Sequence, residues 1–442
     1  LVGSEMCIRD RKFTMEKLFK LKEHGTDVKT EIIAGITTFL AMAYILAVNP
    51  SYLGGIDGMS AGAVFSATAI SAGIATLCMA FFANYPVALA SGMGLNAFFA
   101  FTVCGAMGYS YKVALTAVFI EGIIFMLLSL FKFREALVNK IPSNLKFAIT
   151  AGIGLFIAII ALLNANVVVA SESTTVALGE LSSPTVVLSL VGLLIIGALQ
   201  HYKVPGGILL GILITWVLGI MAQLVGWYVP NPEAGVYSVI PQFSLSSFEA
   251  PKMFQFDFGF IAKNVPAFII IVFTFLYTDI FDTVGTLIGV AEKGKLLDQD
   301  GSLPNATGAL MADAVGTVVG ACLGTSTVTS YVESSAGVAA GGRTGLTAVT
   351  TAVLFFISLI FAPIFTSIPS FATTPAMLYV GLLMLSSIRQ VKFDGDIADA
   401  IGAFLAIIMM PLTYSIANGI MFGIVSWVIP VSYTHLRAHE TD

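Results

Sequence analysis

The sequence predicts an all-α polytopic membrane protein, with fourteen spans arranged as two inverted seven-helix repeats. Of its 442 residues, 57% are hydrophobic and only 11% are charged, whereas a soluble globular chain carries about 25% charged residues. The mean hydropathy is +0.93. The apolar runs are long and continuous, as membrane helices of about 20 residues require, and lack the short alternating pattern of a β-barrel. With a net charge of -5, the composition excludes a cytosolic enzyme, a nucleic-acid binder and a disordered chain.

The individual spans follow from the apolar runs in chain order. We place them at 31–50, 61–83, 87–106, 112–131, 147–166, 184–200, 204–228, 264–290, 308–323, 327–341, 345–366, 373–388, 398–415 and 417–429. The third and the tenth are rich in Gly, Ser and Thr, and the tenth is too short to cross a bilayer alone. The last span is expected to be incomplete.

The two ends of the chain do not fit this pattern. Residues 1–14 have no apolar core and no cleavage site of a targeting signal. At the other end, the apolar helix gives way at about Pro430 to a polar segment. Both ends resemble translated adapter sequence, so we treat 1–14 and 430–442 as foreign or artefactual tails.

The distribution of basic residues predicts the orientation, because cytoplasmic loops carry an excess of Lys and Arg. With the N-terminus in the cytoplasm and the tails excluded, fourteen basic residues fall inside and three outside. The inner ones are Lys17, Lys20, Lys22, Lys29, Lys132, Arg134, Lys140, Lys146, Lys203, Lys293, Lys295, Arg343, Arg389 and Lys392, and the outer ones are Lys112, Lys252 and Lys263. We therefore expect a multi-pass protein of the plasma membrane with a cytoplasmic N-terminus. This uneven distribution of basic residues requires that the two weak segments, the third and the tenth, both cross the membrane.

The two weak segments occupy matching positions in two halves of the chain. The third span carries Asn96 and the tenth carries Glu333, at nearly the offset that separates the first span from the eighth. We therefore expect a first repeat with its outer loop at 15–260 and a second repeat at 261–429. Seven spans is an odd number, so the halves must be inverted. Matched, Gly-broken segments in inverted repeats indicate a transporter with its site at the bilayer midplane, although small residues also serve close helix packing.

Acidic residues inside predicted spans are the candidate functional groups. A charge within the membrane costs at least about 2.5–3.5 kcal/mol, so each acid there is a functional hypothesis. The five are Glu121, Asp279, Asp282, Asp313 and Glu333. A spacing of three places Asp279 and Asp282 on one helix face, where two close carboxylates resist ionising together. The alternative for each acid is a structural hydrogen bond to a neighbouring helix.

Four motifs then resemble a known family, the AzgA-like branch of the nucleobase–cation symporter-2 family, which comprises adenine, guanine and hypoxanthine permeases. They are SGMGLNAFFAF (91–101), FLYTDIFDTVGTL (275–287), GTSTVTSYVESSAGVAAGGRTGLT (324–347) and IIMMPLTYSIANGI (407–420). The resemblance covers essentially all of 15–429. It implies a core domain of spans 1–4 and 8–11 and a gate domain of spans 5–7 and 12–14. It also implies a short strand and a half-helix in both the third and the tenth span.

The resemblance also implies roles for individual residues. Glu333 and Asp279 would bind a purine, and Gly94 and Asn96 would line the site. Asp282 would support the site or the proton coupling, for which Glu121 and Asp313 are further candidates. The residues themselves suggest that Phe98, Phe99 or Tyr331 stacks on the ring, or else packs against lipid or helix.

The function that we expect is import of a purine nucleobase by proton symport, with elevator-like movement of the core against the gate. The partners are a purine and the lipid bilayer, with a homodimer left open; we expect no nucleic acid, cofactor or metal. A same-fold transporter for uracil, xanthine or an anion such as sulfate stays an alternative, and an intramembrane enzyme or a channel is a weaker one. The preferred purine and the choice of H⁺ over Na⁺ are left open.

Overall fold

The computed structural model describes residues 16–130, 143–171, 174–230, 238–240, 249–297 and 303–439, with side chains described up to residue 429. It is a helical protein in which ten helical stretches of the described residues are long and apolar enough to cross a membrane. Three shorter apolar helices, Met93–Ala106, Ile397–Leu412 and Ile416–Ile429, add to them. The predicted fold class is confirmed, while the number of fourteen spans stays a prediction. The predicted tail 1–14 lies outside the described residues.

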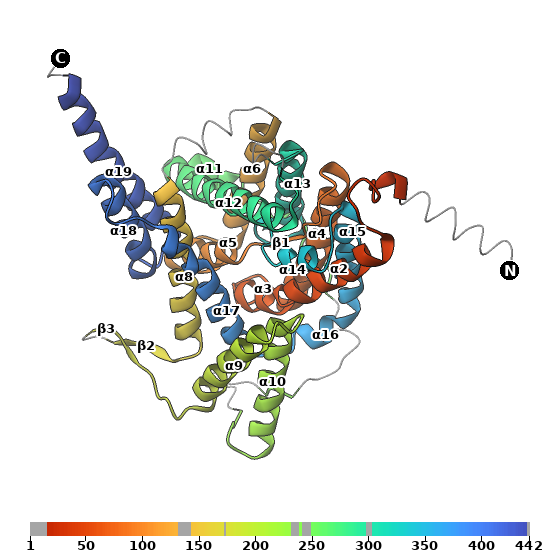
Figure 1. The fold of residues 1–442 in the computed structure, drawn as a ribbon. Helices are drawn as coiled ribbons and strands as arrows, with labels where there is room; N and C mark the ends of the chain where they lie inside the picture. The colour runs from red at the N-terminus through yellow and green to blue at the C-terminus, as the bar shows by residue number, and fades with distance from the viewer. Residues whose placement is uncertain are drawn as a thin grey trace.

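One set of elements forms the core domain, on the right and at the top of Figure 1. Its helices are α2 (Val28–Met42), α3 (Ile45–Leu53), α4 (Ala61–Phe82), α6 (Tyr111–Leu130), α12 (Val265–Gly294), α13 (Ala306–Leu323), α15 (Gly345–Ser358) and α16 (Ala362–Phe365). Helix α4 packs on α13 and α15, while α6 packs on α12 and α13. Each of these contacts joins a helix of the first half of the chain to one of the second.

The remaining long helices form the gate domain, on the left and at the bottom of Figure 1. They are α8 (Ser143–Asn164), α9 (Pro184–His201), α10 (Gly207–Leu224), α17 (Ser370–Leu385), α18 (Ile397–Leu412) and α19 (Ile416–His439). Helix α8 packs on α17 and α18, and α9 packs on α10 and α17. The helix α19 continues to His439 and so enters the segment 430–442 that we treated as a tail.

The two Gly-rich segments are both broken, as predicted. The first consists of β1 (Leu89–Ser91), α5 (Met93–Ala97) and the π-helix η1 (Phe98–Ala106); the second consists of β4 (Val328–Ser330) and α14 (Ser334–Ala339). The strands pair antiparallel, with Leu89 opposite Ser330 and Ser91 opposite Val328. A strand inside the membrane must satisfy its backbone polar groups within the protein, and this pairing at the centre of the core domain does so.

Each of the two strands also accepts a hydrogen bond from the hydroxyl of a threonine. The hydroxyl of Thr76 on α4 donates to the carbonyl oxygen of Leu89 at 3.2 Å, and the hydroxyl of Thr317 on α13 donates to that of Val328 at 2.9 Å. Each strand is thus held by a threonine of the helix that precedes it. The matching contacts reflect the repeat that the sequence predicts.

The structure also contains a hairpin for which the sequence analysis offers no expectation. Strands β2 (Val168–Ser171) and β3 (Thr175–Leu178) pair antiparallel between α8 and α9. Their Val and Thr residues favour extended backbone, and the strands project away from the helices in Figure 1. Two more short helical segments are α11 (Gly259–Lys263) before α12 and the 3₁₀ turn η5 (Ser386–Gln390) after α17.

Candidate substrate cavity

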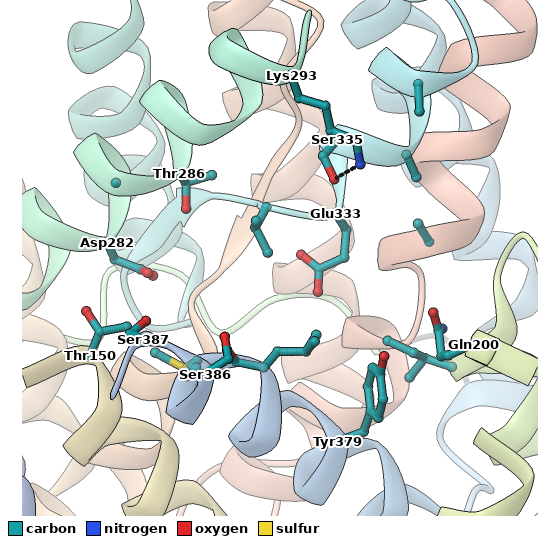
Figure 2. Close-up of a pocket in the computed structure, with 18 of the residues that line it drawn as sticks. Thr150, Gln200, Asp282, Thr286, Lys293, Glu333, Ser335, Tyr379, Ser386 and Ser387 are labelled. Atoms are coloured by element: carbon teal, nitrogen blue, oxygen red, sulfur yellow. Dashed lines mark hydrogen bonds between the residues drawn. The ribbon is translucent and has the colours of Figure 1, made fainter. Parts of the chain in front are cut away.

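A cavity of about 1000 Å³ lies between the core and the gate domains. The core contributes carboxylates to its lining, Asp282 from α12 and Glu333 from the start of α14. The gate contributes polar side chains from α8, α9 and α17, namely Thr150, Gln200 and Tyr379. Figure 2 shows both carboxylates pointing into the space that separates them from these gate residues. Substrate bound here would contact both domains.

The backbone break in the second segment explains where Glu333 lies. Strand β4 ends at Ser330 and α14 begins at Ser334, so Glu333 stands at the helix start. The hydroxyl of Tyr44, between α2 and α3, donates to Oε1 of Glu333 at 2.6 Å. Glu333 and Asp282 are both half-buried. One carboxylate oxygen of Glu333 is therefore oriented by Tyr44, and the carboxyl can still reach the cavity.

The structure divides the predicted acids into two groups. Asp279 is fully buried and does not line the cavity, although it is three residues from Asp282. Instead it interacts electrostatically with Glu121 of α6 and Asp313 of α13, which are also fully buried. The side chain of Thr329 is a hydrogen-bonding neighbour of Asp279, and Asp279 is a hydrogen-bonding neighbour of Glu121, while Asp313 accepts from the hydroxyl of Ser330 at 3.1 Å. The core domain thus holds a buried triad of carboxyls behind the cavity.

The predicted residues of the third span lie close to the strand pair and outside the cavity lining. Asn96 is fully buried; its Oδ1 accepts a hydrogen bond from the hydroxyl of Ser326, and its Nδ2 lies 3.5 Å from the carbonyl oxygen of Ser91. A Cβ at Gly94 would lie 2.7 Å from a methyl group of Ile153 on α8. In this arrangement Asn96 joins the two broken segments, and Gly94 allows the core to approach the gate closely.

The aromatic residues proposed for stacking are also buried away from the cavity. The ring of Phe98 packs edge-to-face on Phe275, with centroids 4.8 Å apart, and the hydroxyl of Tyr331 donates to the carbonyl oxygen of Ser91 at 2.6 Å. Phe99 is fully buried as well. The aromatic residues that do line the cavity are Phe147, Phe281 and Tyr379. Phe281 could have been found from its place between Asp279 and Asp282, but no local signal distinguishes Phe147 or Tyr379.

One buried acid was not among the predicted candidates. Glu31, near the start of α2, is fully buried, and its carboxylate accepts hydrogen bonds from the backbone N–H groups of Arg343, Thr344 and Thr347 and from the hydroxyls of Thr344 and Thr347. These residues form the N-terminus of α15, where unsatisfied N–H groups and the helix dipole favour an anion. Glu31 therefore joins the first helix of one half to a helix of the other.

The fold and the cavity define a class of protein: a multi-pass membrane transporter with two broken segments at its centre. Among the described residues no group of three or more His, Cys, Asp or Glu is arranged to hold a metal ion. A family model described as "Permease family" (Xan_ur_permease) matches residues 29–422. The chain belongs to this xanthine/uracil permease family, whose members are transporters and not enzymes.

Individual relatives support this assignment. The chain is 43% identical to the adenine permease AdeQ of Escherichia coli over 94% of this chain and 90% of that protein. It is 45% identical to the guanine/hypoxanthine permease PbuO of Bacillus subtilis over 93% of each. Among solved structures, the transmembrane domain of the cyanobacterial bicarbonate transporter BicA aligns with a TM-score of 0.66 at 15% identity, over 88% of this chain and 97% of that one. The last likeness shows a shared fold.

Proposed function

We propose that this permease imports purine nucleobases, guanine and hypoxanthine or adenine, by proton symport across the plasma membrane. The relatives named as adenine and guanine/hypoxanthine permeases support the substrate class. The single observation that carries the proposal furthest is the pair of carboxylates, Asp282 and Glu333, that line a cavity between the two domains. Guanine presents its N1–H and 2-amino donors along one edge, hypoxanthine presents N1–H and adenine its 6-amino group, and a carboxylate accepts such donors well.

The gate side of the cavity offers complementary chemistry. Gln200 and Tyr379 can donate to ring nitrogen or carbonyl acceptors. A site that hydrogen-bonds the polar edges of its substrate strongly rejects analogues that lack them. This lining suits a flat, polar heterocycle better than an anion, because its deepest charged groups are acids. For this reason we rank purines above sulfate or bicarbonate as substrates.

The buried triad Glu121, Asp279 and Asp313 is our candidate for the proton site. An isolated ionised carboxylate is very costly in a low-dielectric interior, and Glu121 and Asp279 are both fully buried next to other carboxyls. A carboxyl that holds a proton can instead donate to its neighbour. Asp282 lies three residues from Asp279 on the same helix, so proton transfer between triad and cavity would link protonation to substrate binding.

The position of the cavity suggests how transport proceeds. Its carboxylates belong to the core and its facing polar residues to the gate, so a sliding movement of the core would carry the site across the membrane. The cavity is also lined by Lys203 and Lys293, which the excess of basic residues assigns to the cytoplasmic side. We therefore propose that the structure represents an inward-facing state.

Radiolabelled uptake in cells that lack purine permeases tests the proposal. Unlabelled adenine, guanine, hypoxanthine, xanthine and uracil serve as competitors at two pH values, and we expect uptake to rise at the lower external pH. Glu333→Gln should reduce uptake at least a hundredfold with the protein still inserted, since it removes charge-assisted hydrogen bonds of about 1.5–3 kcal/mol each. Glu292→Gln, an exposed position on α12, is the matched control. Normal uptake by Glu333→Gln, or competition by xanthine and uracil alone, would contradict the proposal.

A further inference from the structure

Two exposed lysines line the same cavity as the carboxylates. Lys203 lies in the turn between α9 and α10, and Lys293 lies in the last turn of α12. The ammonium group of Lys293 donates to the hydroxyl of Ser335 at 3.3 Å, as Figure 2 shows. The ion pairs that the structure gives for the described residues, Lys20–Glu23 and Lys22–Glu16, involve neither lysine.

The cavity is therefore divided by charge. Asp282 and Glu333 are half-buried in it, while Lys203 and Lys293 are exposed, with the half-buried Ser335 in contact with Lys293. A cytoplasmic location explains why basic residues occur at these positions. It does not explain why Lys203 and Lys293 both line one cavity. Lys295 is two residues from Lys293 and does not line the cavity, so a basic residue at this end of α12 need not face it.

The volume also exceeds what a nucleobase needs. At about 1000 Å³, it reaches the upper end of the roughly 300–1,000 Å³ of pockets that enclose drug-sized ligands. A bare purine is smaller than such a ligand and would leave the basic end of the cavity unused. A ligand that fills the cavity carries N–H donors at one end and an anionic group at the other.

We propose that the cavity binds purine nucleoside 5′-monophosphates as inhibitors, with the base at Glu333 and Asp282 and the phosphate at Lys203 and Lys293. This inference rests on the proposed purine function. In guanine the N1–H and 2-amino donors form one edge, and the sugar is attached at N9 on the other side of the ring. When the donor edge faces a carboxylate, the sugar and the phosphate point away from it, toward the rest of the cavity, which Lys203 and Lys293 also line. The phosphate oxygens accept hydrogen bonds from ammonium and hydroxyl groups.

Inhibition is expected because the two lysines belong to different domains. Lys293 belongs to the core domain and Lys203 to the gate domain, so a phosphate held by both would tie the domains together. The reaction class that consumes an imported base is phosphoribosyl transfer, and its product is the nucleoside monophosphate. Binding of that product at the open end of the cavity would slow further import once the base has been converted.

Competition binding to the purified full-length protein in detergent tests this inference. Tritiated guanine is displaced by guanine, guanosine or guanosine 5′-monophosphate, with adenine and its derivatives as a parallel set. We expect the monophosphate to compete better than the nucleoside, and less so at high salt, because salt screens exposed charges. Lys203→Gln and Lys293→Gln should each weaken monophosphate binding about fivefold, the upper range for exposed charge pairs, without changing guanine affinity.

Lys295→Gln is the matched control, since Lys295 and Lys203 share a left-handed backbone conformation, with φ of 53° and 54°. It should leave the binding of all ligands unchanged. The inference is overturned if the base binds but its monophosphate competes no better than the nucleoside, or if the two cavity variants behave like Lys295→Gln. Failure of every purine base to bind is a different result, which would overturn the proposed function itself.

Discussion

Replacing Glu31 by Ala tests whether the two halves of the chain are held together by a buried carboxylate. The side chain accepts from the backbone N–H of Arg343 at 2.8 Å, of Thr344 at 3.3 Å and of Thr347 at 3.1 Å. It also accepts from the hydroxyls of Thr344 and Thr347 at 2.8 and 2.7 Å. All five donors lose this acceptor in Glu31→Ala, and the site is fully buried.

The expected loss of stability follows from these contacts. Each buried backbone N–H left without an acceptor costs about 1–3 kcal/mol, and the interaction of the carboxylate with the N-terminus of α15 adds about 0.3–1 kcal/mol. The hydroxyls can rotate to other acceptors, as Thr347 does toward the carbonyl oxygen of Glu31. We therefore expect the free energy of unfolding to fall by at least about 3 kcal/mol for Glu31→Ala. Glu31→Gln keeps one acceptor oxygen and should lose roughly half of that.

Equilibrium unfolding in mixed detergent micelles measures this difference. The control is Glu23→Ala, because Glu23 is exposed and its pair with Lys20, at 3.4 Å, is a surface contact worth about 0–1 kcal/mol. A double-mutant cycle with Thr347→Val should show coupling to Glu31, since the two side chains share a hydrogen bond. If Glu31→Ala and Glu23→Ala are equally stable, or the cycle shows no coupling, the reasoning is refuted.

Two further predictions concern the surroundings of Glu333. Tyr44→Phe removes the 2.6 Å hydrogen bond to Glu333 and should raise the KM for the base about tenfold, as loss of a hydrogen bond to a charged group does. Tyr52→Phe removes a buried hydroxyl without a partner among the described residues and is the control; equal KM values in the two variants would show that Tyr44 does not orient the carboxylate. Gly337→Ala should abolish uptake, because its Cβ would overlap the hydroxyl of Thr38 and lie 2.6 Å from the carbonyl oxygen of Ala34, which forces α14 away from α2. Gly289→Ala meets nothing within 4 Å and should transport normally, so similar uptake by both glycine variants would contradict this packing.

Features that depend on local sequence were predicted correctly. The membrane fold follows from hydropathy, because a span must be apolar over its own length. The broken segments follow from Gly, Ser and Thr at matching places, and the structure confirms the strands β1 and β4 that the family resemblance implies there. The family follows from four motifs in order. The candidate acids stood out for the same local reason, since each is an expensive group in an otherwise apolar run, and their roles stay a prediction.

Only the tertiary structure decided which acids share a space. Asp279 and Asp282 are three residues apart, yet one lies in a buried triad with Glu121 and the other lines the cavity with Glu333. This depends on how α12 is rotated between α6 and the gate, which side-chain packing sets and residue spacing does not. For the same reason the sequence did not reveal Tyr379 as a cavity residue or Glu31 as the cap of α15. Whether a segment is buried in the bilayer depends on the apolar residues of that segment itself. The partners of a buried group, in contrast, come from helices that are far away in the sequence.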